Sequence, residues 1–206
     1  MSDSKQSATS AGSANHGNYS FNASSKTSYK DNGHVRSFKC VIVGTPRPMD
    51  RPRFVTNKIT GKKHVYSPSG PNVNSFKKAF QEALATCNAA EKFAKGGKLP
   101  VKLVLRFFYA RPKSHYDFVG QLSSGAPIYA TDKADIDNLT KLVMDACQHV
   151  CFGNDITVAH VDAAKLYDPH TKWYSKDSKG HTVIGLEQVY TTEKVADCKC
   201  MQCKYK

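Results

Sequence analysis

The stretch KADIDNLTKLVMDACQHVCFGNDITV, residues 133–158, contains a predicted helix, a turn and the start of a strand. At about 100° per residue, its apolar side chains fall on one stripe, which predicts an amphipathic helix over residues 136–150. The stripe comprises Ile136, Leu139, Val143, Ala146, Cys147 and Val150. After a short turn, the segment Ile156–Tyr167 alternates well enough to predict a strand. The stretch therefore predicts a helix that packs on a sheet through one face.

Further periodic runs flank this stretch. Ser37–Val43 and Leu99–Tyr109 favour strands, and Thr182–Tyr190 favours another after a turn-prone segment. Residues 74–93 repeat apolar side chains at helical spacing, and the two glycines at 96–97 end that helix. The order β-α-β-α-β-β predicts an α+β fold, a small mixed β-sheet with two main helices packed on it.

Two segments are expected to lack regular structure. Pro46, Pro48 and Pro52 exclude a helix and a central strand from the segment that contains them. Residues 110–133 contain Pro, Gly and Ser and predict a long loop. Loops of this length in compact domains are usually functional or disordered.

Composition divides the chain into three parts. Residues 1–35 are rich in Ser, Asn, Gly and Lys with almost no aliphatic side chains, which predicts a disordered tail. Residues 36–193 contain the predicted elements and form one domain. Residues 194–206 form a basic tail that contains cysteines.

The seven cysteines are expected to be reduced. The N-terminus has no apolar segment of signal-peptide length, and no apolar run reaches the roughly 18 residues of a membrane span. We expect a soluble, intracellular protein without structural disulfides, its compartment unspecified. Cys200 and Cys203 have zinc-ligand spacing, but Cys151 or His181 would have to complete the site, so a flexible tail without zinc is favoured.

The charge of the chain points to a polyanionic partner. Thirty Lys and Arg residues against seventeen Asp and Glu give a net charge of +13. Lys and Arg side chains that neutralise phosphates release condensed counterions, which favours nucleic-acid binding. A basic surface kept for solubility is the alternative.

Acidic side chains nevertheless gather in the helix-turn-strand stretch. Asp135 precedes the helix, Asp137 lies in its first turn, and Asn138 adds a neutral oxygen. The helix rises about 1.5 Å per residue, and a short extended return covers a similar length, so Asp155 is expected to come close to both aspartates. Such carboxylates suit Mg²⁺, which prefers oxygen ligands and bridges to phosphate. Helix capping and the helix dipole are the structural alternative.

Two further charged residues lie on the same helix face. Lys141, one turn after Asp137, is a candidate to stabilise charge that develops on a phosphate, or an i,i+4 partner of aspartates. Asp145 lies about 12 Å along the helix from Asp137, which is too far for both carboxylates to bind one metal ion. We therefore expect Asp145 to have a structural role.

A basic segment elsewhere in the chain suits DNA contact. It contains Phe54 among cationic side chains, and an aromatic ring can wedge into opened DNA. A solvated loop is the alternative. The DNA-binding candidates are Arg47, Arg51, Arg53 and Lys58, with Lys62 and Lys63 beside them and Lys165 on the strand after Asp155.

Residues 133–158 resemble the signature of RusA-type Holliday junction resolvases, with its DxDN-L-x-K stretch and a later Asp before a strand. Arg47–Phe54, Tyr66–Pro68 and Tyr109–Lys113 extend the resemblance over roughly residues 37–190. The sequence differs from the family signature at two positions. Ala134 stands where the family commonly has Pro, and Asn154 stands where a second acidic residue is often found.

The resemblance implies a RusA-like fold and catalytic roles for four residues. Asp135, Asp137 and Asp155 would bind metal, and Lys141 would be the catalytic lysine. The resemblance also implies that the enzyme uses Mg²⁺, which Mn²⁺ can replace, and that it needs no organic cofactor. It further implies a homodimer that nicks four-way junctions symmetrically during DNA recombination and repair. The alternatives are a non-catalytic branched-DNA-binding protein and a Mg²⁺-dependent nuclease for other branched DNA or RNA.

Overall fold

The computed structural model describes residues 21–24, 26–32, 35–49, 53–66, 70–86, 93, 99–171 and 179–189. Its strands are β1 (Asn22–Ala23), β2 (Ser28–Asp31), β3 (Val35–Val43), β4 (Arg53–Thr56), β5 (Lys63–Tyr66), β6 (Val101–Tyr109), β7 (Val158–Tyr167) and β8 (His181–Val189). Its helices are α1 (Gly70–Thr86) and α3 (Ile136–Cys147), with short 3-10 helices η1 (Lys113–His115) and η2 (Asp155–Thr157). None of the described helices is long and apolar enough to cross a membrane.

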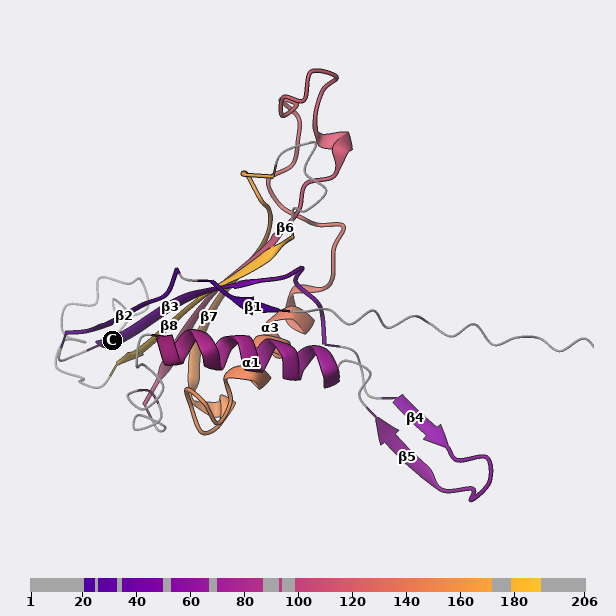
Figure 1. The fold of residues 1–206 in the computed structure, drawn as a ribbon. Coiled ribbons are helices and arrows are strands. Elements are labelled where there is room, and N and C mark those ends of the chain that lie inside the picture. Colours follow the sequence, from indigo (N-terminus) through magenta and orange to yellow (C-terminus); the bar gives the residue numbers. More distant parts are fainter. Residues whose placement is uncertain are drawn as a thin grey trace, which may run out of the picture.

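The main sheet is mixed, and the predicted α+β class is confirmed. Its strand order is β1-β3-β8-β6-β7, and β2 also pairs with β3. Strands β6 and β7 run parallel, whereas the other pairs are antiparallel. The chain leaves β6, forms the long loop and α3, and returns through β7 beside β6 (Figure 1). This β-α-β unit contains the acidic stretch.

Both helices cover one face of the main sheet (Figure 1). On β6 the burial alternates, so that Leu103, Leu105 and Phe107 face the core. Helix α1 buries Phe76, Ala79, Phe80, Ala83 and Leu84. It begins at Gly70 rather than the predicted Asn74; residues 87–92 of the predicted helix lie outside the described residues, and Phe93 is fully buried.

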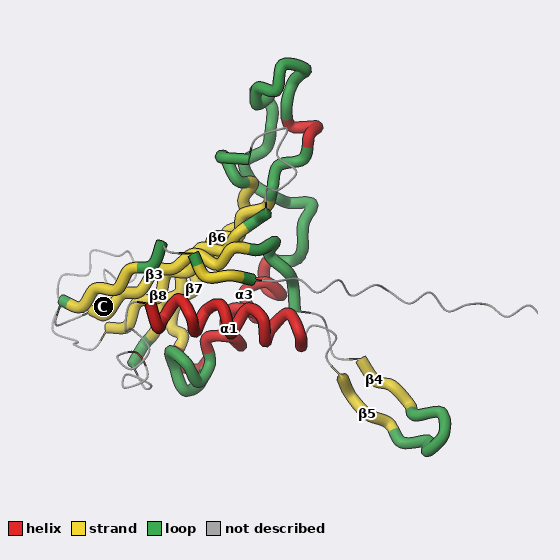
Figure 2. Tube along the Cα trace, in the orientation of Figure 1, coloured by secondary structure: helices red, strands yellow, loops and turns green. Residues whose placement is uncertain are grey.

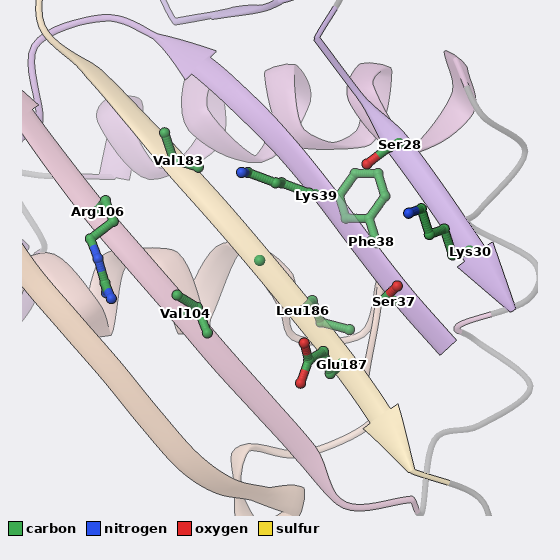
Figure 3. Close-up of a pocket in the computed structure, with 11 residues that line it drawn as sticks. Ser28, Lys30, Ser37, Phe38, Lys39, Val104, Arg106, Val183, Leu186 and Glu187 are labelled. Carbon is green, nitrogen blue, oxygen red and sulfur yellow. The ribbon is translucent and has the colours of Figure 1, made fainter. Parts of the chain in front are cut away.

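The opposite face of the sheet is charged and is left uncovered by the helices, which run behind the strands in Figure 3. Lys39, Arg106 and Glu187 lie on this face (Figure 3). The Arg106 guanidinium binds the Asp162 carboxylate at 2.7 Å, and Lys102 binds Glu187 at 3.2 Å. The alternation of buried and more exposed side chains along β6 therefore separates this open face from the core.

Helix α3 buries most of the predicted stripe. Leu139, Val143, Ala146 and Cys147 are buried, while Ile136 is 38% exposed at the first turn. The helix ends at Cys147, before the predicted Val150, because Gln148 adopts extended backbone angles and His149 has a φ of 62°. This early stop determines where the chain turns toward Asp155.

Strands β1 and β2 lie in the segment for which a disordered tail was predicted. Both pair antiparallel with β3, and Phe21 packs edge-on against Phe76. Backbone hydrogen bonds to an existing strand order residues that carry few aliphatic side chains. Composition alone therefore misjudged residues 22–23 and 28–31, while residues 1–20 lie outside the described part of the chain.

The predicted loop after β6 is anchored at its base and projects from the end of the sheet (Figure 2). The largely buried guanidinium of Arg111 donates to the Pro127 carbonyl at 2.8 Å. The end of the loop then joins β7, since Ala130 N donates to the Lys165 carbonyl at 3.1 Å. These bonds fix the segment that leads into α3.

Candidate active site

Asp135 is the N-cap residue of α3, but its carboxylate does not cap the helix. Its backbone is extended, its carbonyl accepts from Leu139 N at 3.2 Å, and its side chain makes no capping hydrogen bond. Asp137 follows in the first turn, and both side chains are exposed. A capping hydrogen bond therefore does not explain the carboxylate of Asp135.

A hollow of about 540 Å³ runs along the exposed face of α3. Asp137, Lys141 and Asp145 line it at successive helical turns, as the spacing predicted. Asp155 lines it from η2, and Val161 and Ala163 line it from β7. Two of the three predicted catalytic carboxylates and the predicted lysine therefore share one cavity.

Local hydrogen bonds present Asp155 to this hollow. The Asn154 side chain accepts from Ile156 N at 3.1 Å and thereby caps the 3-10 turn η2. Asp155, at the first position of that turn, remains exposed. Asn154, which replaces a frequent acidic residue of the signature, thus has a structural role beside the site.

The three predicted metal ligands do not form one compact cluster. Asp135 is not among the residues that line the hollow, and no three His, Cys, Asp or Glu side chains of the described residues are grouped to hold one ion. The expectation of close convergence assumed that the chain returns along the length of α3. In the structure, residues 148–154 connect α3 to η2, and the charge of Asp155 acts on Asp145.

Asp145 belongs to the same hollow, although spacing along the helix had assigned it to structure. It is half-buried, and its pKa is raised by burial and by the charge of Asp155, against the opposing effect of Lys141. The i,i+4,i+8 pattern of Asp137, Lys141 and Asp145 was visible in the sequence. What spacing did not reveal was that the charge of Asp155 would act on Asp145.

Lys165 holds the backbone that leads to Asp135. Its ammonium donates to the Ala134 carbonyl at 2.9 Å and lies 3.5 Å from the Lys133 carbonyl oxygen. These contacts favour a positioning role, while its predicted contact with DNA stays a prediction.

Replacing Lys165 by methionine is expected to lower the cleavage rate about tenfold, because the Ala134 carbonyl loses a charged donor. Affinity for DNA and its dependence on salt should change little. Steady-state cleavage and salt titrations of binding would test this. A fall of about one in the salt slope would instead identify Lys165 as a phosphate contact.

The remaining basic candidates lie in two places. Arg47 lies near the segment before Asp135, and Met49 N donates to the Asn138 carbonyl at 3.1 Å, which ties this proline-containing segment to α3. Arg53 and Lys58 are exposed on the separate β4–β5 hairpin (Figure 1). Arg51 and the cysteine tail lie outside the described residues, and Cys40, Cys147 and Cys151 are buried.

The donor set of the hollow fits a hard, hydrated cation. Mg²⁺ commonly binds through one or two carboxylates together with water and substrate phosphates. Asp137 and Asp155 supply two exposed carboxylates, neither of which forms an ion pair with a described Lys, Arg or His. An open site with two carboxylates matches this coordination better than an all-protein cage.

An acidic hollow beside a lysine, on a strongly basic α+β domain, is typical of a nuclease that cleaves phosphodiesters. The family model described as Endodeoxyribonuclease RusA matches residues 44–196, about three quarters of the chain. The chain therefore belongs to the RusA family of endodeoxyribonucleases. No curated protein and no solved structure matches it.

Proposed function

We propose that this protein is a Mg²⁺-dependent endodeoxyribonuclease that resolves Holliday junctions by paired nicks during DNA recombination and repair. The supporting observation is that Asp137, Lys141 and Asp155 line one hollow within the segment that matches the family model. The net charge of +13 supports DNA as the partner.

The residues of the hollow divide the chemistry between them. Asp137 and Asp155 would hold Mg²⁺, and Asp135 would add a carboxylate beside the first turn of α3. When bound, the ion activates water and neutralises charge on the phosphate. Lys141, one helical turn from Asp137, would stabilise the negative charge that develops on the phosphate oxygens or the leaving oxygen.

Paired nicks require two sites related by symmetry. A four-way junction presents two equivalent strands, and a two-fold homodimer presents one hollow to each. We therefore propose a homodimer as the active form.

The β4–β5 hairpin is the proposed DNA clamp. It contains Arg53, Lys58, Lys62 and Lys63 and no acidic residue between positions 53 and 66. Phe54 pairs across the strands with Val65, and both are exposed, at 78% and 56%. The exposed pair could pack against unstacked bases at the branch point, while the cations bind phosphates.

Neutralising Arg53 and Lys58 together as glutamines is expected to weaken junction binding at least tenfold near 0.1 M salt. The slope of log K against log salt should become shallower by about two, one for each lost phosphate contact. Fluorescence anisotropy across a salt series would measure both effects. Lys102→Gln on the open sheet face is the matched control, and an equal slope in all variants would contradict the clamp.

The proposed activity is tested with a panel of substrates, with and without Mg²⁺. Four-way junction, flap, duplex and hairpin RNA would be compared at equal concentration on denaturing gels. We expect symmetric nicks in the junction only when Mg²⁺ is present. Binding without nicks at any metal concentration would identify a non-catalytic junction-binding protein, and preferential cleavage of flap or RNA would identify another nuclease.

A further inference from the structure

A second hollow, of about 450 Å³, lies next to the acidic segment but shares no lining residue with the first. Three stretches of chain surround it: the segment after β3, the end of β6, and the residues just before Asp135. Its lining residues are Thr45, Pro46, Arg47, Pro48, Tyr109, Ala110, Asp132, Lys133 and Ala134. Ala134 directly precedes the first proposed metal ligand, so the hollow is continuous in sequence with the active site.

Tyr109 lines this hollow, and its hydroxyl is a hydrogen-bond donor that meets no acceptor in the part of the chain that the structure describes. The side chain is 6% exposed, and its hydroxyl is buried without a hydrogen-bond partner among the described residues. Burial raises the pKa of Tyr109 to about 12, so the hydroxyl keeps its proton at neutral pH. A buried donor without a partner is costly, which suggests that a ligand supplies the acceptor.

The charges at the hollow favour an anion. Arg47 and Lys133 are cationic, and Asp132 is the one carboxylate among its lining residues. That carboxylate accepts from the Lys133 ammonium at 2.8 Å and from the Tyr167 hydroxyl. The charges of Arg47 and Asp132 both act on the Tyr109 hydroxyl, with opposite effects on its pKa, so Arg47 lies near that hydroxyl.

The hollow is fixed to the start of α3 from two sides. Met49 N donates to the Asn138 carbonyl at 3.1 Å, and the Lys165 ammonium donates to the Ala134 carbonyl at 2.9 Å. A ligand held here would therefore have a defined position relative to Asp135 and Asp137. A chain of phosphates can occupy two such neighbouring places at once.

We propose that this second hollow binds a DNA backbone phosphodiester adjacent to the one that is cleaved, with the Tyr109 hydroxyl and Arg47 as donors. The inference rests on the proposed nuclease function, because it takes DNA as the ligand. Phosphodiester oxygens accept hydrogen bonds, carry the complementary charge and offer no donor that would compete with Tyr109. The bound phosphate would set the register of the strand over the acidic hollow.

The test combines Tyr109→Phe with neutral linkages in the DNA. Single methylphosphonates would be placed at successive positions around the cut site of a four-way junction, and binding measured without divalent metal. We expect one linkage to weaken binding of the wild-type protein about tenfold. Tyr109→Phe should bind the unmodified junction about tenfold more weakly and should be markedly less sensitive to that linkage, with Arg47 accounting for the sensitivity that remains. Tyr129→Phe, at an exposed tyrosine, is the matched control.

Thermal unfolding separates a lost contact from a damaged fold. Tyr109→Phe removes a hydroxyl that has no described partner, so its melting temperature should equal or exceed that of the wild type. Wild-type affinity of Tyr109→Phe, or unchanged sensitivity to every methylphosphonate, would overturn the proposal. Displacement of the junction by inorganic phosphate at constant ionic strength, with no effect of any methylphosphonate, would also overturn it in favour of a free-anion site.

The outcome is separable from that of the proposed function. If one methylphosphonate weakens binding by the wild type more than binding by Tyr109→Phe, but the protein nicks no substrate, the phosphate site is supported and the nuclease function is refuted. Normal nicking without this difference would refute the phosphate site alone. A wild-type protein that does not bind the junction would overturn both.

Discussion

Asp137→Asn is expected to abolish the nicking of four-way junctions while leaving junction binding largely intact. The substitution keeps the size of the side chain but removes one of the two exposed carboxylates of the acidic hollow. A bound metal ion contributes several kcal/mol of transition-state stabilisation, and a loss of about 4 kcal/mol corresponds to roughly a thousandfold in rate. Binding should persist because removing a negative charge does not weaken attraction to phosphate.

Single-turnover cleavage and anisotropy measure the two quantities separately. Asp162→Asn is the matched control, since Asp162 is an aspartate of β7 that pairs with Arg106 and is not among the residues that line the acidic hollow. We expect the control to nick at nearly the wild-type rate. Nicking by Asp137→Asn at that same rate would refute the assignment of the hollow as the active site.

Much of the fold was predictable because burial imposes a period on the sequence. The stripe of Leu139, Val143 and Ala146 predicted α3, and the β-branched and aromatic residues of Leu99–Tyr109 predicted β6. Both signals are local: the first is the period that burial of one helix face imposes, and the second is residue composition. The α+β class follows from the order of such elements and is confirmed by the mixed sheet.

Features that depend on distant partners were not predictable in the same way. Strands β1 and β2 contain few aliphatic residues and are strands because β3 supplies backbone hydrogen bonds. The hairpin around Phe54 was predicted only as a basic loop, although its register pairs Phe54 with Val65. Propensity and composition do not reveal which edge a short segment will join.

The candidate site was predicted in its residue types and only partly in its geometry. Helical spacing placed Asp137, Lys141 and Asp145 on one face, and the structure keeps that arrangement. The position of Asp155 depended on the segment after α3, in which His149 adopts a left-handed backbone conformation before η2 begins at Asp155. Turn geometry of this kind is not encoded in a periodic pattern. Distance along the helix therefore did not predict that the Asp155 charge would also act on Asp145.

Because Asp145 and Asp155 line the same hollow, comparing Asp155→Asn with Asp145→Asn will show which of the two carboxylates binds the metal. Asp155 is exposed and free of ion pairs with the described cations, whereas burial disfavours the charged form of Asp145. A hard cation binds more readily to an exposed carboxylate than to a half-buried one, so Asp155→Asn should lower the nicking rate about a thousandfold.

Asp145→Asn should lower the rate about tenfold or less, because it alters the field at Asp155 and Lys141 without removing a ligand. Raising the Mg²⁺ concentration distinguishes the two roles further. It should not restore the activity of Asp155→Asn, because this variant lacks a carboxylate oxygen that stabilises the transition state. It should restore most of the activity of Asp145→Asn. Equal, unrescued losses in both variants would make Asp145 a ligand as well. The metal would then lie at the C-terminal half of α3, between Asp145 and Asp155, rather than beside Asp137.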